Sequence, residues 1–256
     1  GTSGYEEAAA QGLMAGINAA LKIKGQPPLI LQRHEAYIGV LIDDLVTLGT
    51  KEPYRMFTSR AEYRLLLRND NAQMRLTEVA QRTGLISEVD LGRFELKRTL
   101  IAEELSRLQS VMASPGLIND ALSALNTTAI AQMTPLAQLL RRPEVTYDLI
   151  ERFYPGQPLA SDVKAFVETE IKYEGYVRQQ ERLVERLKKL EFKQIPIDFD
   201  YRSVSGLSRE VLGKLEEVRP ETVGQAGRIP GVTPAAVALL MVIIEKTKRA
   251  AGGLNP

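Results

Sequence analysis

Residues 161–192 read SDVKAFVETEIKYEGYVRQQERLVERLKKLEF, and this stretch decides the fold class. Its apolar side chains recur every three or four positions, the spacing of one helix face, which predicts a single long helix. Gly175 lies inside it, although glycine costs about 1 kcal/mol relative to alanine in a helix interior. Either another backbone approaches closely there or the helix bends. The apolar positions are Val163, Phe166, Val167, Ile171, Val177, Leu183, Leu187 and Leu190.

Helix start signals recur along the rest of the chain. Several hydroxyl residues precede an acidic or amide residue by three positions, which is the spacing of a capping box. Thr-Pro pairs also place a capping hydroxyl before proline at the first helical position. Sustained apolar–polar alternation is scarce, so the chain is predicted to be mainly α. The signals are Ser3 with Glu6, Ser59 with Glu62, Ser87 with Asp90, Thr222 with Gln225, Thr134-Pro135, Thr233-Pro234, Ser161 and Ser208.

Turn residues divide the remaining chain into short segments. The stretch 59–68 is ambiguous, because Arg60, Arg64 and Arg68 share one face in a helix and also in a strand. A capping-box spacing at its start favours the helix. The other expected helices are 1–21, 72–83, 87–113, 117–125, 134–141 and 144–153, with about three more in 201–256 after an extended connector at 195–198.

Composition excludes several classes of protein. The chain has 256 residues, which suggests one large or two modest domains, and 44% hydrophobic residues exclude wholesale disorder. With 33 basic and 32 acidic residues, any cationic surface must be local. The absence of cysteine excludes disulfides and thiolate metal sites, and a single histidine excludes a histidine metal cluster. No apolar run reaches the length of a membrane span, so we expect a cytoplasmic protein without membrane contact.

Residues 51–82 carry seven cations against four carboxylates, and six of the cations are arginines. Arginine grips phosphate bidentately and stacks on bases, which favours an RNA-backbone surface. A solvated helix face with local ion pairs explains the charges equally well. The cations are Lys51, Arg55, Arg60, Arg64, Arg68, Arg75 and Arg82, with Tyr54, Phe57 and Tyr63 between them.

Two further places present backbone N–H groups. Residues 1–7 combine glycines with a helix start, whose free N–H groups would suit a phosphate or the electron-rich edge of a flavin ring. The alternative is an ordinary capped helix without a ligand. The turn at 224–236 resembles a helix-hairpin-helix, which holds DNA phosphate, although a helical interaction module is favoured. His34 is expected to be structural or on the surface. The pair Asp43-Asp44 is compatible with a bound cation, but such a pair more often marks a helix end or loop.

Five ordered stretches together resemble the C-terminal part of the MnmG (GidA) flavoprotein family, whose members modify the wobble uridine of tRNA. They extend from one end of the chain to the other and are more specific than any single motif. The stretches are GTSGYEEAAAQG at 1–12, AYIGVLIDD at 36–44, EPYRMFTSRAEYRL at 52–65, IKYEGY at 171–176, and GQA at 224–226 with GVTPAA at 231–236.

The resemblance implies a division of the chain. Residues 1–75 form the end of an α/β FAD-binding domain, 76–195 a helical domain and 196–256 a C-terminal helical subdomain. The whole enzyme uses FAD, NADH and a folate one-carbon donor on C5 of the uridine, with the GTPase MnmE as partner, and it forms a homodimer. The family's dinucleotide fingerprint and catalytic cysteines belong upstream, so this chain alone is expected to be inactive and not to retain FAD.

The candidate site residues, none of them catalytic or metal-binding, include two that the resemblance itself assigns. Arg55 and Arg64 fall on family arginines implicated in tRNA binding, and Arg60 and Arg68 support them. The cofactor candidates are Gly1, Thr2, Gly4, Tyr5 and Glu6, and the partner candidates are Arg228, Thr233 and Lys246.

Two alternatives from other classes stay open on sequence alone. The chain is either a free-standing helical nucleic-acid-binding protein that uses the turn at 224–236, or a structural adaptor with 161–192 as its docking rod. An apolar stripe of Val237, Leu240, Met241 and Ile244 either docks the GTPase or belongs to a core.

Overall fold

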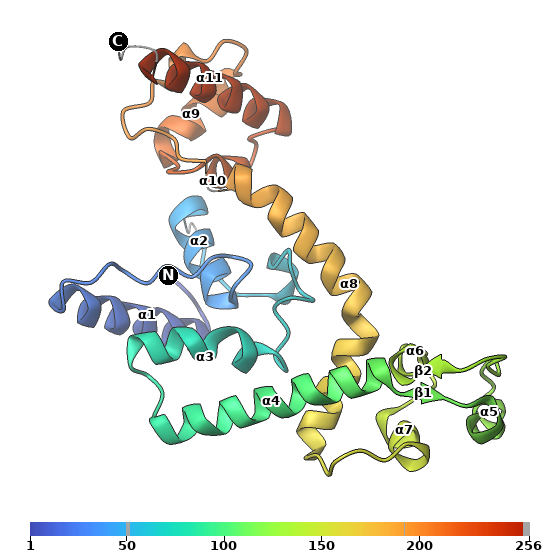
Figure 1. Ribbon diagram of the computed structural model, residues 1–256. Helices are drawn as coiled ribbons and strands as arrows, with labels where there is room; N and C mark the ends of the chain where they lie inside the picture. Colours follow the sequence, from blue (N-terminus) through green and yellow to red (C-terminus); the bar gives the residue numbers. More distant parts are fainter. Residues whose placement is uncertain (50–51, 192, 253–256) are drawn as a thin grey trace. The chain divides into compact units, whose positions relative to one another are not determined.

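The computed structural model describes residues 1–49, 52–191 and 193–252, and these are mostly helical, which confirms the predicted fold class (Figure 1). The chain forms two compact units. One consists of residues 1–64 and 181–256, and the other of residues 65–180. The division is not collinear with the sequence, because the central segment is an insertion between two parts of the first unit. The expected domain boundaries after residues 75 and 195 stay predictions.

The unit 65–180 is built on the helices α3 (Ala72–Thr83), α4 (Glu88–Ser110) and α8 (Ser161–Glu191), of which α8 continues beyond residue 180. A two-stranded antiparallel ribbon follows α4, with Met112 opposite Pro135 and Ala113 opposite Thr134. The shorter elements are β1 (Met112–Ala113), α5 (Pro115–Ala124), β2 (Thr134–Pro135), α6 (Leu136–Leu140) and α7 (Tyr147–Phe153).

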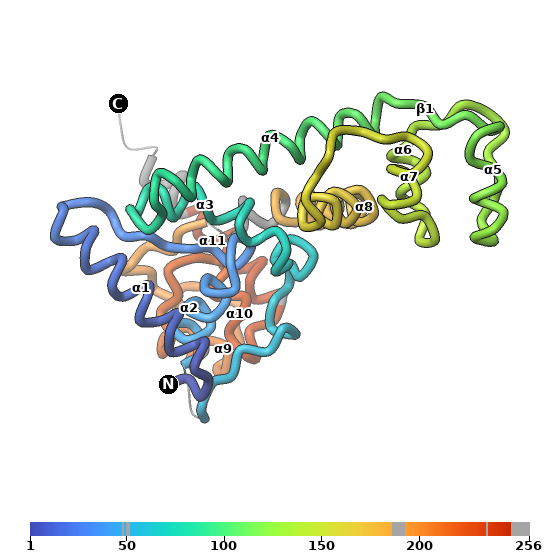
Figure 2. Tube along the Cα trace, turned by 90° about the horizontal axis from the view of Figure 1, so that it is seen from below, coloured from blue at the N-terminus to red at the C-terminus, as the bar shows by residue number. Residues whose placement is uncertain are grey.

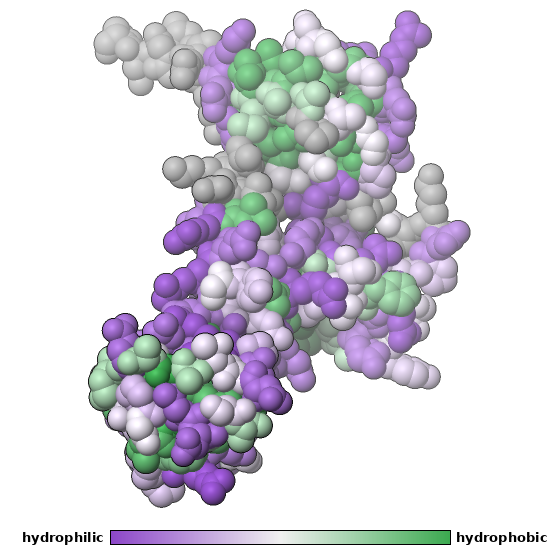
Figure 3. Space-filling model, turned by 90° about the vertical axis from the view of Figure 1, so that its right-hand side faces the viewer, coloured by the Kyte–Doolittle hydropathy of each residue, from purple (hydrophilic) through white to green (hydrophobic). Residues whose placement is uncertain are grey.

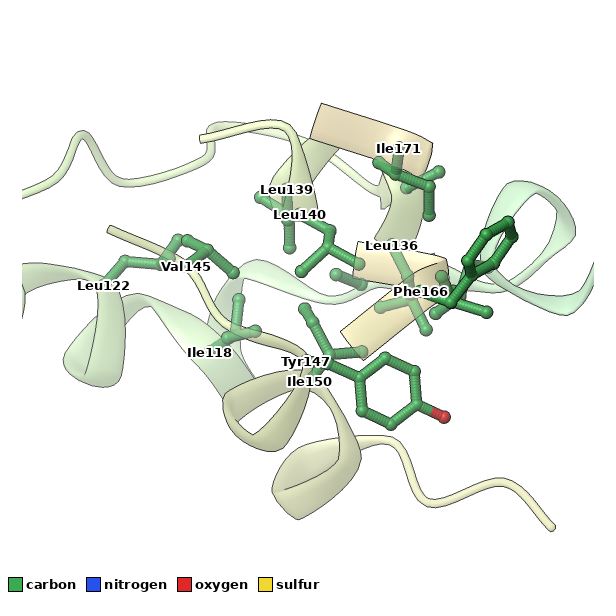
Figure 4. Packing of buried hydrophobic residues seen from close by; sticks show 14 of the residues in the cluster. Ile118, Leu122, Leu136, Leu139, Leu140, Val145, Tyr147, Ile150, Phe166 and Ile171 are labelled. Carbon is green, nitrogen blue, oxygen red and sulfur yellow. The ribbon is translucent and has the colours of Figure 1, made fainter. Parts of the chain in front are cut away.

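Apolar side chains from α4 to α8 form the core of this unit. Figure 4 shows Ile118 and Leu122 of α5 pointing toward the leucines of α6 and toward Ile150 of α7. Several of these side chains are completely buried. Each contributes about 1.5–3 kcal/mol by leaving water, so short helices that are marginal in isolation are stabilised here by packing.

The other unit combines both ends of the chain. Helix α2 contacts α1 and α10, and α10 contacts α11, and Figure 2 shows these helices side by side. A second apolar core lies among residues 195–244. The elements are α1 (Tyr5–Ile23), α2 (Tyr37–Leu48), η1 (Thr58–Arg60), η2 (Tyr201–Ser203), α9 (Arg209–Val218), α10 (Val223–Arg228) and α11 (Pro234–Gly252).

Local capping explains where several helices begin. The hydroxyls of Ser87, Ser208 and Thr222 accept the backbone N–H three residues on, and Thr222 completes a capping box with Gln225. The predicted caps at Ser3 and Thr134 are wrong. Their hydroxyls instead donate to backbone carbonyls of Tyr54 and Gln132.

The predicted helix at 59–68 is also wrong. Only the 3-10 turn η1 forms, and from Ala61 to Arg64 buried and exposed residues alternate as in a strand, although no strand pairs there. The physical reason is that the Glu62 carboxylate binds Arg33 instead of capping a helix at Ser59.

The apolar stripe on α11 belongs to the core and is not a docking surface. Leu240 and Ile244 are completely buried, and Val237 and Met241 pack against the same cluster. Figure 3 shows apolar side chains exposed among hydrophilic ones over the C-terminal helices, in the upper part of the picture. Val242, on another face of α11, is half exposed.

Candidate nucleic-acid interface

The arginine-bearing loop after residue 52 is tied to the start of the chain. The Tyr54 N–H donates to the Gly1 carbonyl, and the Ser3 N–H donates to the Tyr54 carbonyl, each at 2.9 Å. The buried Glu7 carboxylate accepts the Met56 N–H at 2.8 Å. This hydrogen bond lowers the pKa of Glu7, and nearby Arg55 adds to the effect. The loop is therefore anchored by backbone pairing with the residues before α1 and by one ionised side chain of α1.

A buried arginine lies behind the loop. The Arg33 guanidinium donates to Asp44 at 2.6 Å, to Asp43 at 3.0 Å and to Glu62 at 2.7 Å. Only 7% of Arg33 is exposed. Burial by itself would lower the pKa of Arg33, but the hydrogen bonds to Glu62 and Asp44 raise it above its ordinary value. Arg33 therefore stays charged and joins α2 to the residues after η1.

Tyr54 and Arg60 extend this centre to the surface. The Tyr54 hydroxyl donates to Asp44 at 2.8 Å. Burial raises the pKa of Tyr54, and the hydrogen bond to the Asp44 carboxylate raises it further. The Arg60 guanidinium lies 4.5 Å from the centre of the Tyr54 ring, which is cation–π geometry. Its Nε also donates to the Arg55 carbonyl at 3.1 Å. Arg60 is thus oriented by an aromatic face and a backbone carbonyl while its side chain stays 38% exposed.

The structure places the four arginines predicted to bind tRNA in different surroundings. Arg55, Arg60 and Arg64 belong to the unit with the N-terminus, and all three are exposed. Within the part of the chain that the structure describes, no carboxylate pairs with Arg64. Arg68 belongs to the other unit, where it forms ion pairs with Asp70 and Glu170. Arg55 and Arg60 stay exposed although each also lies near a carboxylate, Arg55 at 3.8 Å from Glu7 and Arg60 at 3.7 Å from Asp44. Arg68 is the most covered of the three paired arginines, with 12% of its side chain exposed.

The predicted cofactor residues lie at the N-terminus of α1. Gly4 precedes the helix, and a Cβ built there would lie 1.6 Å from the Glu7 carboxylate, so any side chain at this position would displace that carboxylate. Tyr5 is almost fully exposed. The first-turn N–H groups give this end of the helix a partial positive charge. The carboxylates of Glu6 and Glu7 disfavour a phosphate at the same place.

The predicted partner residues also have defined surroundings. The Arg228 Nε lies 2.8 Å from Asp43, and this pair links α10 to α2. The Thr233 hydroxyl accepts the Ala236 N–H and caps α11, and Lys246 is exposed on the same helix. In the turn at 224–236, Arg228 is thus engaged within the chain. Next to Gly231 of this turn, Lys214 of α9 pairs with Glu210 of the same helix.

Sequence reasoning missed Arg33 and the role of Glu62. The available signal was the pair Asp43-Asp44, because two adjacent carboxylates inside α2 need a positive charge nearby. Arg33 and Arg228 supply this charge. The described residues include no group of three or more histidine and acidic side chains arranged to hold a metal. His34 has a structural contact, edge-on to the Tyr63 ring. None of the described helices is long and apolar enough to span a membrane.

Comparisons with known proteins agree along the whole chain. Residues 88–181 match the family model of the tRNA modifying enzyme MnmG/GidA C-terminal helical domain, and residues 183–254 match that of its C-terminal helical bundle. Residues 1–27 match the family called glucose inhibited division protein A.

Curated relatives and solved structures give the same result. The tRNA uridine 5-carboxymethylaminomethyl modification enzyme MnmG of Thermodesulfovibrio yellowstonii is 58% identical over 96% of this chain, and that of Caldicellulosiruptor saccharolyticus is 50% identical over 97%. This chain spans about 40% of the length of both. Aquifex aeolicus GidA, in its form II crystal, superposes with a TM-score of 0.79 at 42% identity, covering 95% of this chain and 38% of that one. The chain therefore belongs to the MnmG (GidA) family, and it contains that family's C-terminal helical region.

Proposed function

We propose that this chain is the tRNA- and partner-binding region of an FAD-dependent enzyme that modifies C5 of the wobble uridine of tRNA. The observation that carries the proposal is the identity of 50–58% with MnmG enzymes along nearly the whole chain. The catalytic steps, with FAD and NADH, belong to the whole enzyme. Because no catalytic residue is assigned to this chain, it is proposed to be inactive alone.

The arginine loop supports the tRNA part of the proposal. Arg55, Arg60 and Arg64 present guanidinium groups from a loop that is anchored by Glu7 and by the Arg33 centre. Arginine forks match phosphate oxygens, and contacts to phosphates fix the register and orientation of an RNA rather than its sequence. A loop held rigidly before binding loses less conformational entropy when tRNA binds.

The cofactor and partner parts rest on separate features. The N-terminus of α1, from Gly1 to Glu6, is proposed to complete the flavin site of the whole enzyme. Lys246 and the segment around Thr233 are proposed to dock the GTPase, because they are exposed on α11 while its apolar stripe faces the core. The division at residues 75 and 195, the homodimer and the cytoplasmic location belong to the same proposal.

The decisive experiment measures the affinity of the chain for tRNA at several salt concentrations. Arg55→Ala and Arg64→Ala should each weaken binding to all tRNAs alike and reduce the slope of log affinity against log salt by about 0.7–0.9. Arg93→Ala is the matched control, because Arg93 lies on α4 with 77% of its side chain exposed. Melting temperatures are measured on the same samples. Normally folded variants with unchanged affinity and slope would refute the arginine surface.

Two further measurements test the other parts. Lys246→Glu should weaken capture of the purified GTPase without changing tRNA affinity, and unchanged capture would place the docking surface elsewhere. A chain that keeps a flavin absorbance band through gel filtration would contradict the expectation that α1 alone does not retain FAD.

A further inference from the structure

An open groove of about 500 Å³ runs along the middle of α8, in the unit formed by residues 65–180. Gly175 is one of its lining residues, together with Arg141, Tyr176 and Arg178. The groove is separate from the arginine loop at 52–64, which belongs to the other unit. Neither the arginine loop nor the GTPase surface uses it.

Gly175 has no explanation within the chain. It lies in the interior of a helix of 31 residues, where glycine is less stable than alanine. A Cβ at this position would meet nothing within 4 Å, so neither a close backbone nor a bulky neighbour requires glycine. The bare backbone instead faces the groove. A glycine that the fold does not need, in the lining of a groove, leaves room for a molecule to approach the α8 backbone closely.

The groove is positively charged. Glu174 forms ion pairs with both Arg141 and Arg178, so two guanidinium groups share one carboxylate. Lys172 lies on the same wall and pairs with Glu168 at 2.8 Å. The excess cation and the fork geometry of arginine match an anion such as a phosphate.

Aromatic faces accompany these charges. Tyr176 is 62% exposed and Tyr173 is 42% exposed, although tyrosines of a core would be covered. Their ring centres lie 6.5 Å apart, and Arg68 lies over the Tyr173 ring at 6.0 Å. Exposed tyrosines next to arginines are the combination on which unpaired bases stack while the neighbouring phosphates are held.

We propose that this groove binds unpaired nucleotides of RNA, with a base stacked on Tyr176 and the adjoining phosphate held by Arg141 or Arg178. The strand passes over Gly175, where a side chain would obstruct it. An RNA occupant is argued from the excess of cationic groups, which matches a phosphate, beside an exposed aromatic face, which matches a base. The inference rests on the proposed function and assigns tRNA a second contact surface outside the arginine loop.

The test measures affinity for tRNA and its salt dependence with the full chain. Tyr176→Ala should weaken binding by about fivefold or more, which corresponds to the loss of one stacked base, without changing the salt slope. Tyr176→Phe keeps the aromatic face and should restore binding. Arg178→Gln should instead reduce the slope by about 0.7, the value for a phosphate contact with a single strand.

Gly175→Ala separates function from folding. Alanine fits the open space and favours the helix, so the melting temperature should rise by about 2–4 °C. Affinity for tRNA should nevertheless fall. Leu117→Ala is the matched control, since Leu117 is half exposed on α5 of the same unit and should leave affinity unchanged.

Other outcomes distinguish the two proposals. If Arg55→Ala weakens tRNA binding but Tyr176→Ala and Gly175→Ala do not, the groove proposal is wrong while the proposed function stands. Loss of GTPase capture in Tyr176→Ala with unchanged tRNA affinity would identify the groove as a protein surface and overturn the proposal. A wild-type chain without tRNA affinity would overturn both. If Tyr176→Ala lost as much affinity for a fully paired RNA duplex as for tRNA, that result would also contradict stacking on an unpaired base.

Discussion

Residues 29–64 and residues 101–171 are held in place by different interactions. The second segment surrounds a large apolar cluster with many completely buried leucines and isoleucines. The first segment belongs to neither apolar cluster, and its centre is Arg33 with Asp43, Asp44 and Glu62. An apolar core orders helices by covering them. A buried ion cluster orders a loop while the arginines of that loop stay exposed, which suits a surface that binds a polyanion.

The unit formed by residues 65–180 also contains a buried charge, and it has a different role. Glu104 is 1% exposed and pairs with Arg107, one turn along the same helix, at 2.7 Å. The Tyr147 hydroxyl donates to the same carboxylate at 2.8 Å. Burial raises the pKa of Tyr147, and the hydrogen bond to Glu104 raises it further. This pair is local and lies beside an apolar core. Arg33 instead joins residues 10 to 29 positions away in the sequence.

Removal of Arg33 should have the largest effect. Arg33→Ala leaves the buried Asp44 carboxylate without its nearest cation, which we expect to cost about 3–5 kcal/mol in the unit that contains the loop, while Asp43 keeps Arg228. Hydrogen exchange should show lost protection in residues 29–64 and unchanged protection around Ile118 and Ile150. Arg33→Lys should recover only part, because an ammonium cannot replace the fork. Equal protection in wild type and Arg33→Ala would contradict this view.

Removal of Glu104 should have a smaller effect on the other unit. Glu104→Ala leaves the Tyr147 hydroxyl and Arg107 without their partner, at a cost of about 2–3 kcal/mol. Arg107 is partly exposed and can be solvated, and the apolar cluster remains. Urea unfolding would measure the loss. If Glu104→Ala proved more damaging than Arg33→Ala, the contrast between the two segments would be wrong.

The Asp43–Arg228 pair tests how the two ends of the chain are joined in one unit. A double-mutant cycle with Asp43→Asn and Arg228→Gln should give a coupling energy of about 1–2 kcal/mol, typical of residues in one ion-pair network. The cycle is needed because Asp43 also binds Arg33. Thermal unfolding of the four proteins supplies the energies. Additive effects would mean that α10 is held on α2 by apolar contacts alone.

Glu7 should produce the smallest effect, and one that depends on pH. Its folded-state pKa lies below the ordinary value of 4.5, because it accepts the Met56 N–H. Its stabilising contribution is therefore complete above pH 4.5 and disappears as the pH falls through the lower folded-state value. Glu7→Gln should be less stable than wild type at pH 7, with the difference closing in acid. A difference that stayed constant down to pH 3 would exclude this role.

The sequence by itself determined the parts of the molecule that depend on nearby residues. The helix at 72–83 forms as expected and is followed by Gly84 in a left-handed conformation. The prediction of a helix over 161–192 agrees with α8 from Ser161 to Glu191, and residue 192 lies outside the described residues. The caps at Ser87 and Thr222 were predictable because their partners lie three residues away. The ordered motifs were also sufficient to indicate the family.

Only the tertiary structure decided what depends on distant residues. Arg33 binds Glu62, which is 29 positions away in the sequence, and Arg228 binds Asp43, which is 185 positions away. No local sequence pattern predicts either pair. The same contact explains the failed helix at 59–68, since Glu62 is withdrawn to Arg33. The apolar stripe on α11 likewise fitted a core or a docking face until its neighbours were known. Periodicity tells which side chains share a face, but the contacts that a face makes depend on how the chain folds back on itself.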